Sequence, residues 1–311
     1  MPLLEKALIA RIRRQSPVWP RVAASIGDDC AVLRPPKNHE ILVTTDFSLE
    51  SVHFRREWHS PEVVGHRCLT RGLSDIASMG GQPIAAFLSL ALPKDLPQKW
   101  ADRFFRGFLA LANRHKVTLA GGDIAQSRSG VLADIVVIGS VPRGKAVLRS
   151  TARPGDLIYV TGELGGSAAA LHELMHGQKP DARKYPRHFS PEPRLRVGQF
   201  LREKNLATAM IDLSDGLSTD LTHICEESGV GAKISAAALP RAENSLDLAL
   251  HGGEDYELLF TAAKKAKIPK SLAGVPITRI GEITRERKLI LLHGKNLASQ
   301  LKPQGWEHFS S

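Results

Sequence analysis

Cysteines, aromatic residues and long apolar runs are all scarce in this chain of 311 residues. Its three cysteines, Cys30, Cys68 and Cys225, are far apart and form no CxxC pair, which argues against a disulfide framework or a cysteine-rich zinc site. Such cysteines are typical of a reducing compartment, so we expect a cytoplasmic protein. The longest nearly apolar run, residues 84–93, is far shorter than the roughly 20 residues that span a bilayer, and no membrane partner is expected.

Acidic residues are also outnumbered, with 32 Asp and Glu against 42 Lys and Arg and a net charge of +10. An excess of this size occurs in proteins that bind nucleic acids, membrane surfaces or phosphorylated small molecules. The basic residues are scattered, however, and none joins aromatic residues at the spacing of an RNA-recognition signature. We therefore expect solvated helix faces and loops, and no nucleic-acid partner.

The hydrophobic pattern predicts a mixed α/β fold in two halves. Strand-like runs alternate with helical patterns along the first half, namely strands at 41–45, 84–92 and 131–141 and helices at 62–79 and 96–115. The second half repeats this pattern, with strands at 157–160, 258–261 and 277–283 and near Ile234, and helices at 167–176, 195–204 and 217–227. A pause at 143–156 predicts domains 1–145 and 146–311.

Two further segments have a distinct pattern. The N-terminus predicts an amphipathic helix with Leu4, Leu8 and Ile12 on one side, and not a signal peptide. Residues 177–193 are expected to form a mobile basic linker, because they combine proline, glycine and many positive charges.

Five short segments combine aspartate with glycine or a hydroxyl residue. They are IGDDCAVL (26–33), ILVTTDFSLESVHF (41–54), GLSDIASMGG (72–81), VTLAGGDIAQS (117–127) and MIDLSDGLSTDL (210–221). Asp46 is expected just beyond a buried strand, and Asp123 just after a strand that Gly121 and Gly122 interrupt. Asp75 and Asp215 are each expected at a helix start. Taken singly, such aspartates are usually helix caps or turn residues.

Carboxylates from all five segments would repel one another if the fold gathered them, unless cations were present. Oxygen ligands at short range select Mg²⁺ or Ca²⁺, and several Mg²⁺ ions suggest phosphate groups that share them. The residues alone therefore suggest an acidic, metal-binding site for a polyphosphate, provided that the segments converge.

The five segments, in this order, resemble the thiamine-monophosphate kinase family of the aminoimidazole ribonucleotide synthetase-like superfamily. GGEDYELLFT (252–261), the run 144–171 and the terminal GWEHF match this family as well. The resemblance implies an α/β (α+β) fold of two mixed domains, of which the N-terminal one binds ATP and Mg²⁺ and forms a homodimer. It implies in-line transfer of the γ-phosphoryl group of ATP onto thiamine monophosphate, with several Mg²⁺ ions. No general base is expected, because the acceptor phosphate is already ionised.

The resemblance also assigns roles to individual residues. The implied metal ligands are Asp29, Thr44, Thr45, Asp46, Asp75, Asp123, Asp212 and Asp215. The implied ATP contacts are Gly122, Asp123, Arg149 and Ser214, and the implied substrate contacts are His53 and Glu254. Asp28 belongs to the same Gly-Asp-Asp motif, and Asp255 offers a further acceptor or counter-charge for a cationic ring. Trp306 offers a stacking surface for the substrate, with ordinary packing of the C-terminus as the alternative.

Three other motifs favour different chemistry. GSVPRGKA (139–146) lacks the final Ser or Thr of a P-loop. TGELGGSA (161–168) suits a tight strand-to-helix turn, with phosphate binding at the helix N-terminus as the alternative. HELMH (172–176) has the spacing of a zinc metalloprotease helix, with His188 or Glu192 as a third ligand.

Three different functions remain open at this point. The first is another synthetase of the same superfamily, of the aminoimidazole ribonucleotide or selenophosphate type. The second is that of a catalytically silent nucleotide-binding protein, and the third is that of a basic nucleic-acid-binding protein.

Overall fold

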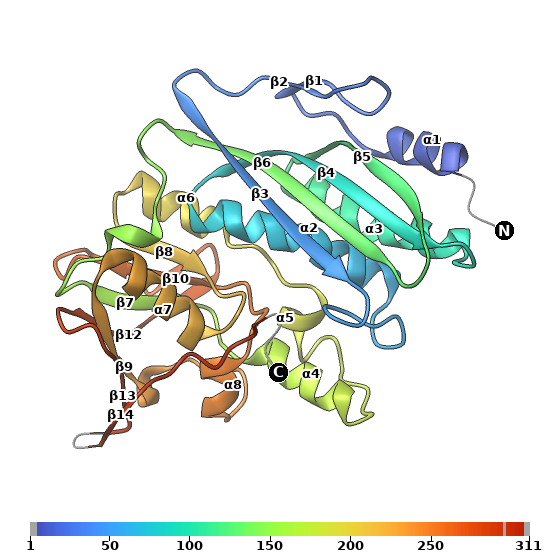
Figure 1. Ribbon diagram of the computed structural model, residues 1–311. Coiled ribbons are helices and arrows are strands. Elements are labelled where there is room, and N and C mark those ends of the chain that lie inside the picture. Colours follow the sequence, from blue (N-terminus) through green and yellow to red (C-terminus); the bar gives the residue numbers. More distant parts are fainter. Residues whose placement is uncertain (1–4, 295–296, 308–311) are drawn as a thin grey trace. The chain divides into compact units, whose positions relative to one another are not determined.

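The computed structural model describes residues 5–294 and 297–307, so that Leu4 and the last two residues of GWEHF lie outside the described part. The chain divides into two compact units, which are Met1–Ile76 with Gly81–Gly144, and Ala77–Gly80 with Lys145–Ser311. Each unit contains its own β-sheet and helices, which confirms the prediction of two mixed α/β domains (Figure 1). None of the helices in the described ranges has the length and apolar character needed to cross a membrane.

The first unit is built on a four-stranded sheet in the order β3-β6-β4-β5. Its strands are β3 (His39–Leu49), β4 (Gln82–Pro93), β5 (Thr118–Ser127) and β6 (Leu132–Pro142). Strands β4 and β5 are parallel and the other pairs are antiparallel. Side chains alternate between the two faces of a strand, so the buried residues mark the face that the helices cover.

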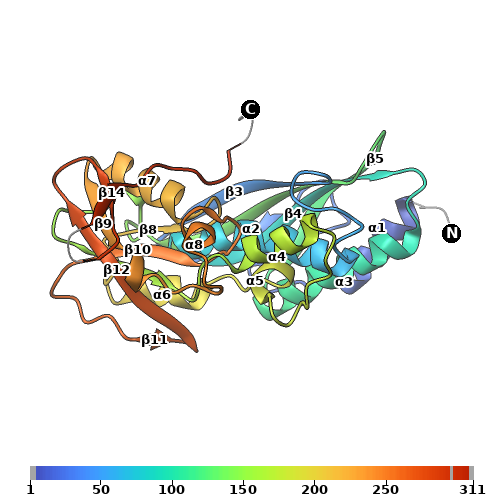
Figure 2. The same ribbon diagram turned by 90° about the horizontal axis from the view of Figure 1, so that it is seen from below.

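Helices α2 (Pro61–Ser78) and α3 (Gln98–Arg114) lie on one face of this sheet, as the two views together show (Figures 1 and 2). Helix α3 buries an aromatic cluster in which Phe104 and Phe108 are fully enclosed. The two helices approach closely because Gly65 and Gly107 have no side chain. A Cβ on Gly65 would lie 2.1 Å from the carbonyl oxygen of Phe104.

The opposite face of the sheet is partly covered and partly open. The hairpin β1 (Val22–Ala24) and β2 (Val32–Leu33) contributes Val22 to a small cluster with Ile84, Ala85 and Ala120. Three apolar side chains of β3 remain exposed, at 46% for Ile41, 61% for Val43 and 53% for Phe47. Helix α1 (Glu5–Gln15) buries Leu8 and Ile12, as the sequence predicts.

The second unit contains an eight-stranded sheet in the order β14-β13-β9-β12-β7-β10-β8, with β11 paired to β12. Its strands are β7 (Leu157–Thr161), β8 (Ala209–Asp212), β9 (Gly231–Ser235), β10 (Leu258–Ala262), β11 (Ser271–Leu272), β12 (Val275–Thr284), β13 (Leu289–Leu292) and β14 (Ala298–Gln300). The helices are α4 (Gly166–Met175), α5 (Pro186–Phe189), α6 (Leu195–Glu203), α7 (Leu217–Ser228) and α8 (Leu246–His251). Residues of α7 and α8 pack with the sheet in one core.

The segment expected to be a mobile basic linker is instead tied to the second unit. It contains α5, and His188 and Phe189 of that helix are buried. The guanidinium of Arg187 lies 3.1 Å from the carboxylate of Glu257, which is fully buried. The expectation was wrong because the partner of this arginine lies about 70 residues further along the chain, where no local pattern reveals it.

Candidate functional site

The Gly-Asp-Asp and Gly-Gly-Asp segments line one pocket of the first unit. This pocket has a volume of about 540 Å³, and its lining includes Asp28, Asp29, Gly122 and Asp123. The three aspartates are exposed. Apolar residues complete the wall, and they come from α1, β4, α3 and β5: Ile9, Ile12, Phe87, Leu88, Phe105 and Leu119. The pocket thus combines acidic side chains with apolar ones.

Gly122 allows β5 to run close to its neighbour β4. Its φ of +144° is a conformation that side chains rarely adopt, and an added Cβ would lie 1.9 Å from the carbonyl oxygen of Leu88. The strand therefore does not stop at the two glycines, as the sequence suggested, but continues through Asp123 to Ser127. The glycines serve strand pairing, and Asp123 is held on a β-strand and not on a loop.

Asp46 and Asp75 also lie elsewhere along their elements than expected. Asp46 lies within β3, not beyond it, because the apolar run continues into Phe47 and Leu49. Asp75 lies in the last turn of α2 and not at a helix start, since that helix begins at Pro61. The hydroxyl of Thr44 donates a hydrogen bond to the carboxylate of Asp75, which joins these two predicted ligands.

The predicted ligands of the first unit form two groups. Asp46 pairs with Ile135 of β6, whose side chain is buried under the helices, whereas Asp123 pairs with the exposed Ser89 of β4. Strands β3 and β5 form opposite edges of the sheet, so three strand spacings, roughly 14 Å, separate the two aspartates. Alternation along the strands places them on opposite faces, with Thr45 exposed on the face opposite to Asp46.

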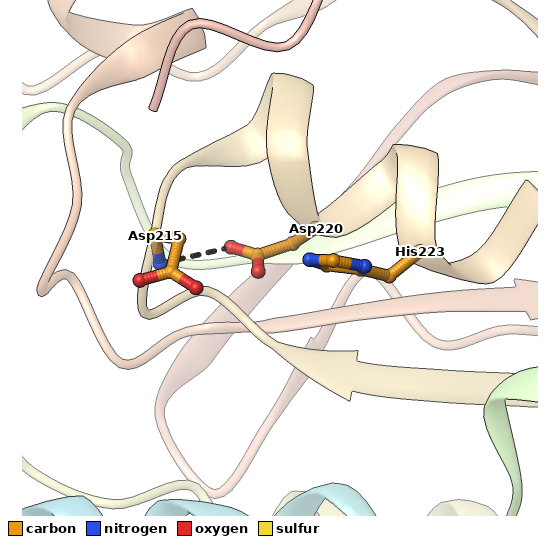
Figure 3. A group of neighbouring side chains, drawn as sticks. All are labelled: Asp215, Asp220 and His223. Atoms are coloured by element: carbon orange, nitrogen blue, oxygen red, sulfur yellow. Dashed lines mark hydrogen bonds between the residues drawn. The ribbon is translucent and has the colours of Figure 1, made fainter. Parts of the chain in front are cut away.

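The Asp-Leu-Ser-Asp-Gly segment of the second unit lies between β8 and α7. Asp212 ends β8 and is buried, and Asp215 precedes α7, which confirms its expected place at a helix start. Asp215, Asp220 and His223 lie together, with ligand atoms within 4.8 Å of one another (Figure 3). Within the described ranges, this is the sole group of three or more such side chains that meets that distance.

Asp220 and His223 are the residues that the sequence analysis missed. They are three residues apart on α7, a spacing that places two side chains on the same side of a helix and was the available signal. Asp220 is buried and accepts hydrogen bonds from the backbone N–H groups of Asp215 and Gly216. Burial, followed by the charges of Asp212 and Asp215, raises the pKa of Asp220 well above its usual value.

The Gly-Gly-Glu-Asp loop folds against this segment. Glu254 has a φ of +63°, and its backbone N–H donates to the carbonyl of Ser214, so that one predicted substrate contact lies beside one predicted ATP contact. The expectation for Asp255 was wrong. Its buried carboxylate accepts hydrogen bonds from the backbone N–H groups of Gly165 and Ser167 at 2.6 and 3.0 Å, at the start of α4.

The same contacts decide between the two interpretations of TGELGGSA. A phosphate at the N-terminus of α4 would need those N–H groups, and Asp255 already occupies them. This segment is therefore the tight strand-to-helix turn between β7 and α4. The first four residues of GSVPRGKA belong to β6 and no helix follows directly, so the P-loop context is absent there.

Trp306 lies in the C-terminal tail, which is attached to α7. The backbone N–H of Trp306 donates to the carbonyl of Asp215, and the N–H of Gly305 donates to the hydroxyl of Thr219. The indole is 54% exposed and lines a pocket of about 430 Å³ together with Asp215, His223 and Glu226. The tail is thus positioned by backbone contacts, while the tryptophan side chain remains accessible.

The other predicted residues are placed as follows. His53 follows β3, and its Nδ1 accepts a hydrogen bond from the backbone N–H of Leu49 at 3.0 Å. Arg149 is exposed in a short 3-10 helix at Arg149–Thr151, and its backbone carbonyl accepts a hydrogen bond from Ser228.

The chain is similar to known proteins along most of its length. The family described as AIR synthase related protein matches with its N-terminal domain at residues 27–141 and with its C-terminal domain at residues 153–294. The thiamine-monophosphate kinase of Escherichia coli (strain K12) is 37% identical over 308 residues, which cover 93% of each chain.

Solved structures give the same result. The thiamine-monophosphate kinase from Stenotrophomonas maltophilia K279a is 36% identical with a TM-score of 0.81, over 94% of this chain and 97% of that one. AaThiL complexed with AMPPCP and TMP is 32% identical with a TM-score of 0.77, over 98% and 97%. With relatives this similar along nearly its whole length, the chain belongs to the thiamine-monophosphate kinase family.

Proposed function

We propose that the protein phosphorylates thiamine monophosphate with ATP, giving thiamine diphosphate and ADP. The observation that carries this proposal is the similarity over nearly the whole chain to AaThiL, a protein whose structure contains AMPPCP and TMP. The pocket of the first unit supports it, because an apolar lining suits a nucleobase and a volume of about 540 Å³ is that of a small-molecule site.

The chemistry requires charge neutralisation more than proton transfer. The attacking oxygen belongs to a phosphate that is ionised at neutral pH, so no side chain has to remove a proton from it. The obstacle is repulsion between the phosphates of the two substrates. The Asp28, Asp29 and Asp123 carboxylates are the hard oxygen donors that Mg²⁺ prefers, and they line one pocket. Mg²⁺ ions held there would neutralise charge on the transferred group.

The remaining assignments extend this proposal. Thr44, Thr45, Asp46 and Asp75 would contribute further metal ligands from the first unit, and Asp212 and Asp215 from the second. Arg149 and Ser214 would contact ATP, with Arg149 suited to a bidentate contact with phosphate oxygens. His53, Glu254 and Trp306 would bind the substrate, and the exposed indole of Trp306 supports a role in stacking on a cationic ring.

The direct test is an assay with ATP, Mg²⁺ and thiamine monophosphate. Thiamine diphosphate and ADP are the expected products, whereas release of orthophosphate without diphosphate would indicate a synthetase of the superfamily instead. Asp123→Asn should abolish turnover without unfolding the protein, because the amide cannot supply the negative charge. Asp95→Asn is the matched control, since Asp95 is exposed in the same unit and does not line the pocket. Wild-type turnover in Asp123→Asn would contradict the metal assignment.

We also infer a homodimer that forms through the first unit. The exposed apolar side chains of Ile41, Val43 and Phe47 lie on one face of an edge strand, and exposed apolar side chains grouped in this way are typical of an interface. Val43→Asp should give a monomer in light scattering, while Val18→Asp, at another exposed apolar site, should leave the oligomer intact. A wild-type protein that is monomeric at micromolar concentration would refute the dimer.

A cytoplasmic location is part of the same proposal. Cys30, Cys68 and Cys225 are all free thiols, which suits a reducing compartment.

A further inference from the structure

We propose that His172, Met175 and His176 form a binding site for one copper ion at the C-terminal end of α4. The function proposed above assigns no role to these three residues, and the copper site is independent of it. The observations that carry it are the packing of the two imidazoles, one hydrogen bond that defines a tautomer, and an exposed methionine three residues after His172.

The two imidazole rings are already adjacent. Their centroids are 4.2 Å apart with an interplanar angle of 35°, and both side chains are exposed. Residues four apart on a helix lie on the same side, so a small rotation about the side-chain bonds is enough for both rings to contact one ion. Two such nitrogens bind a transition-metal ion at about 2.0 Å each.

One hydrogen bond determines which nitrogen of His176 is available. Its Nδ1 lies 2.7 Å from the backbone carbonyl oxygen of His172. Because a carbonyl only accepts, Nδ1 must carry the hydrogen, and in the neutral ring Nε2 keeps the lone pair. Histidine ligands in metal sites typically donate their second N–H to a backbone carbonyl in this way.

Met175 supplies a third, softer ligand. Its side chain is 68% exposed, an unusual position for a long apolar residue, and it is three residues from His172 on the same side of the helix. A thioether with imidazoles favours copper, above all Cu(I), over zinc or magnesium.

The contacts do not favour the metalloprotease interpretation of HELMH. Glu173, which would activate water in such an enzyme, accepts a hydrogen bond from the hydroxyl of Tyr185 at 2.5 Å. His188, one of the expected third ligands, is buried and lies 3.0 Å from the hydroxyl of Ser167. The proposed copper site therefore uses the exposed pair and the methionine between them, without Glu173 or His188.

The test is competition for Cu(I) between the full-length protein and a chromogenic Cu(I) chelator, under ascorbate and without oxygen. All variants carry Cys30→Ser, because the exposed thiol of Cys30 would bind Cu(I) itself. The parent should withdraw one equivalent of Cu(I), and the double variant His172→Asn, His176→Asn should lose it. Met175→Leu should weaken Cu(I) binding several-fold and leave Ni²⁺ binding unchanged.

His223→Asn is the matched control, since His223 belongs to the other group of metal-ligand side chains, and it should bind as the parent does. Retention of the equivalent by the double variant would overturn the proposal, as would its loss in His223→Asn. Equal Cu(I) affinity in Met175→Leu and the parent would overturn the choice of copper.

Discussion

The second unit contains a buried network of charged groups around the carboxylate of Glu257. Replacing Glu257 tests how much this network contributes to the stability of the unit. Glu257 is fully buried directly before β10, and its two oxygens accept hydrogen bonds from Nε and Nη2 of Arg194 at 2.7 and 2.6 Å. Thr161 of β7 donates a third hydrogen bond to it, and Arg187 of α5 lies at 3.1 Å. Glu257→Gln keeps the size of the side chain and removes its charge.

The expected loss of unfolding free energy follows from the burial of the two arginines that pair with Glu257. Arg194 is only 7% exposed, so Glu257→Gln would leave its guanidinium buried without a counter-charge and facing a side-chain amide. Removing one partner of a buried ion pair costs about 3–5 kcal/mol. Arg187 is 21% exposed and would recover part of its hydration. We therefore expect the free energy of unfolding to fall by about 3–5 kcal/mol, a large share of the ~5–15 kcal/mol that stabilises typical domains.

Urea unfolding followed by circular dichroism measures this change. The matched control is Glu286→Gln, because Glu286 and Lys288 form an ion pair of similar length, 2.7 Å, with side chains that are 68% and 59% exposed. Water screens such a pair, so the control should leave the free energy of unfolding close to that of the wild type. A Glu257→Gln protein within about 1 kcal/mol of wild type would show that the buried network contributes no more than a surface pair.

Two further variants test the surroundings of α7. Gly305→Ala should raise the KM for thiamine monophosphate with little change in the KM for ATP. The reason is that an added Cβ would lie 2.0 Å from the carbonyl oxygen of Asp215 and displace the tail that carries Trp306. Equal KM values for thiamine monophosphate in variant and wild type would show that the tail does not take part in substrate binding. Burial lowers the pKa of His251 below its usual value of 6.5, so the unfolded protein takes up a proton first and stability should fall as the pH drops below about 6.5. His251→Gln should flatten this part of the curve of melting temperature against pH, and a curve of unchanged slope would contradict the assignment.

Elements with long apolar runs could be predicted from the sequence, whereas the positions of single residues along them could not. The expected strand at 84–92 corresponds to β4 and the expected helix at 62–79 to α2, since their patterns extend over many residues. Asp75 was misplaced because Ser-Asp also occurs at helix starts, although the helix predicted at 62–79 already places Asp75 inside it. Asp46 was misplaced because a polar residue in an edge strand interrupts the apolar pattern without ending the strand.

The candidate site was predictable in its residue types and only partly in its grouping. The Gly-Asp-Asp and Gly-Gly-Asp segments do line one pocket. The sequence contains nothing that specifies strand order, and the order β3-β6-β4-β5 is what keeps Asp46 away from Asp123. Asp255 illustrates a second limit, because a carboxylate in a glycine-rich loop resembles a ligand contact until its hydrogen-bond donors are known.

The carboxylates of the chain differ in their surroundings, and this difference indicates which of them could hold metal ions. Asp220, Asp255 and Glu257 are buried, and each accepts hydrogen bonds from N–H groups of the chain, so these three carboxylates have partners within the fold. Asp29 and Asp123 instead line an open pocket. An ATP phosphate near two such carboxylates would be repelled, and the net charge of +10 does not remove this local repulsion because exposed charges are screened beyond about 8 Å. Cations placed between nucleotide phosphates and these carboxylates would offset this repulsion, which is the role that the proposed Mg²⁺ ions would have in this pocket.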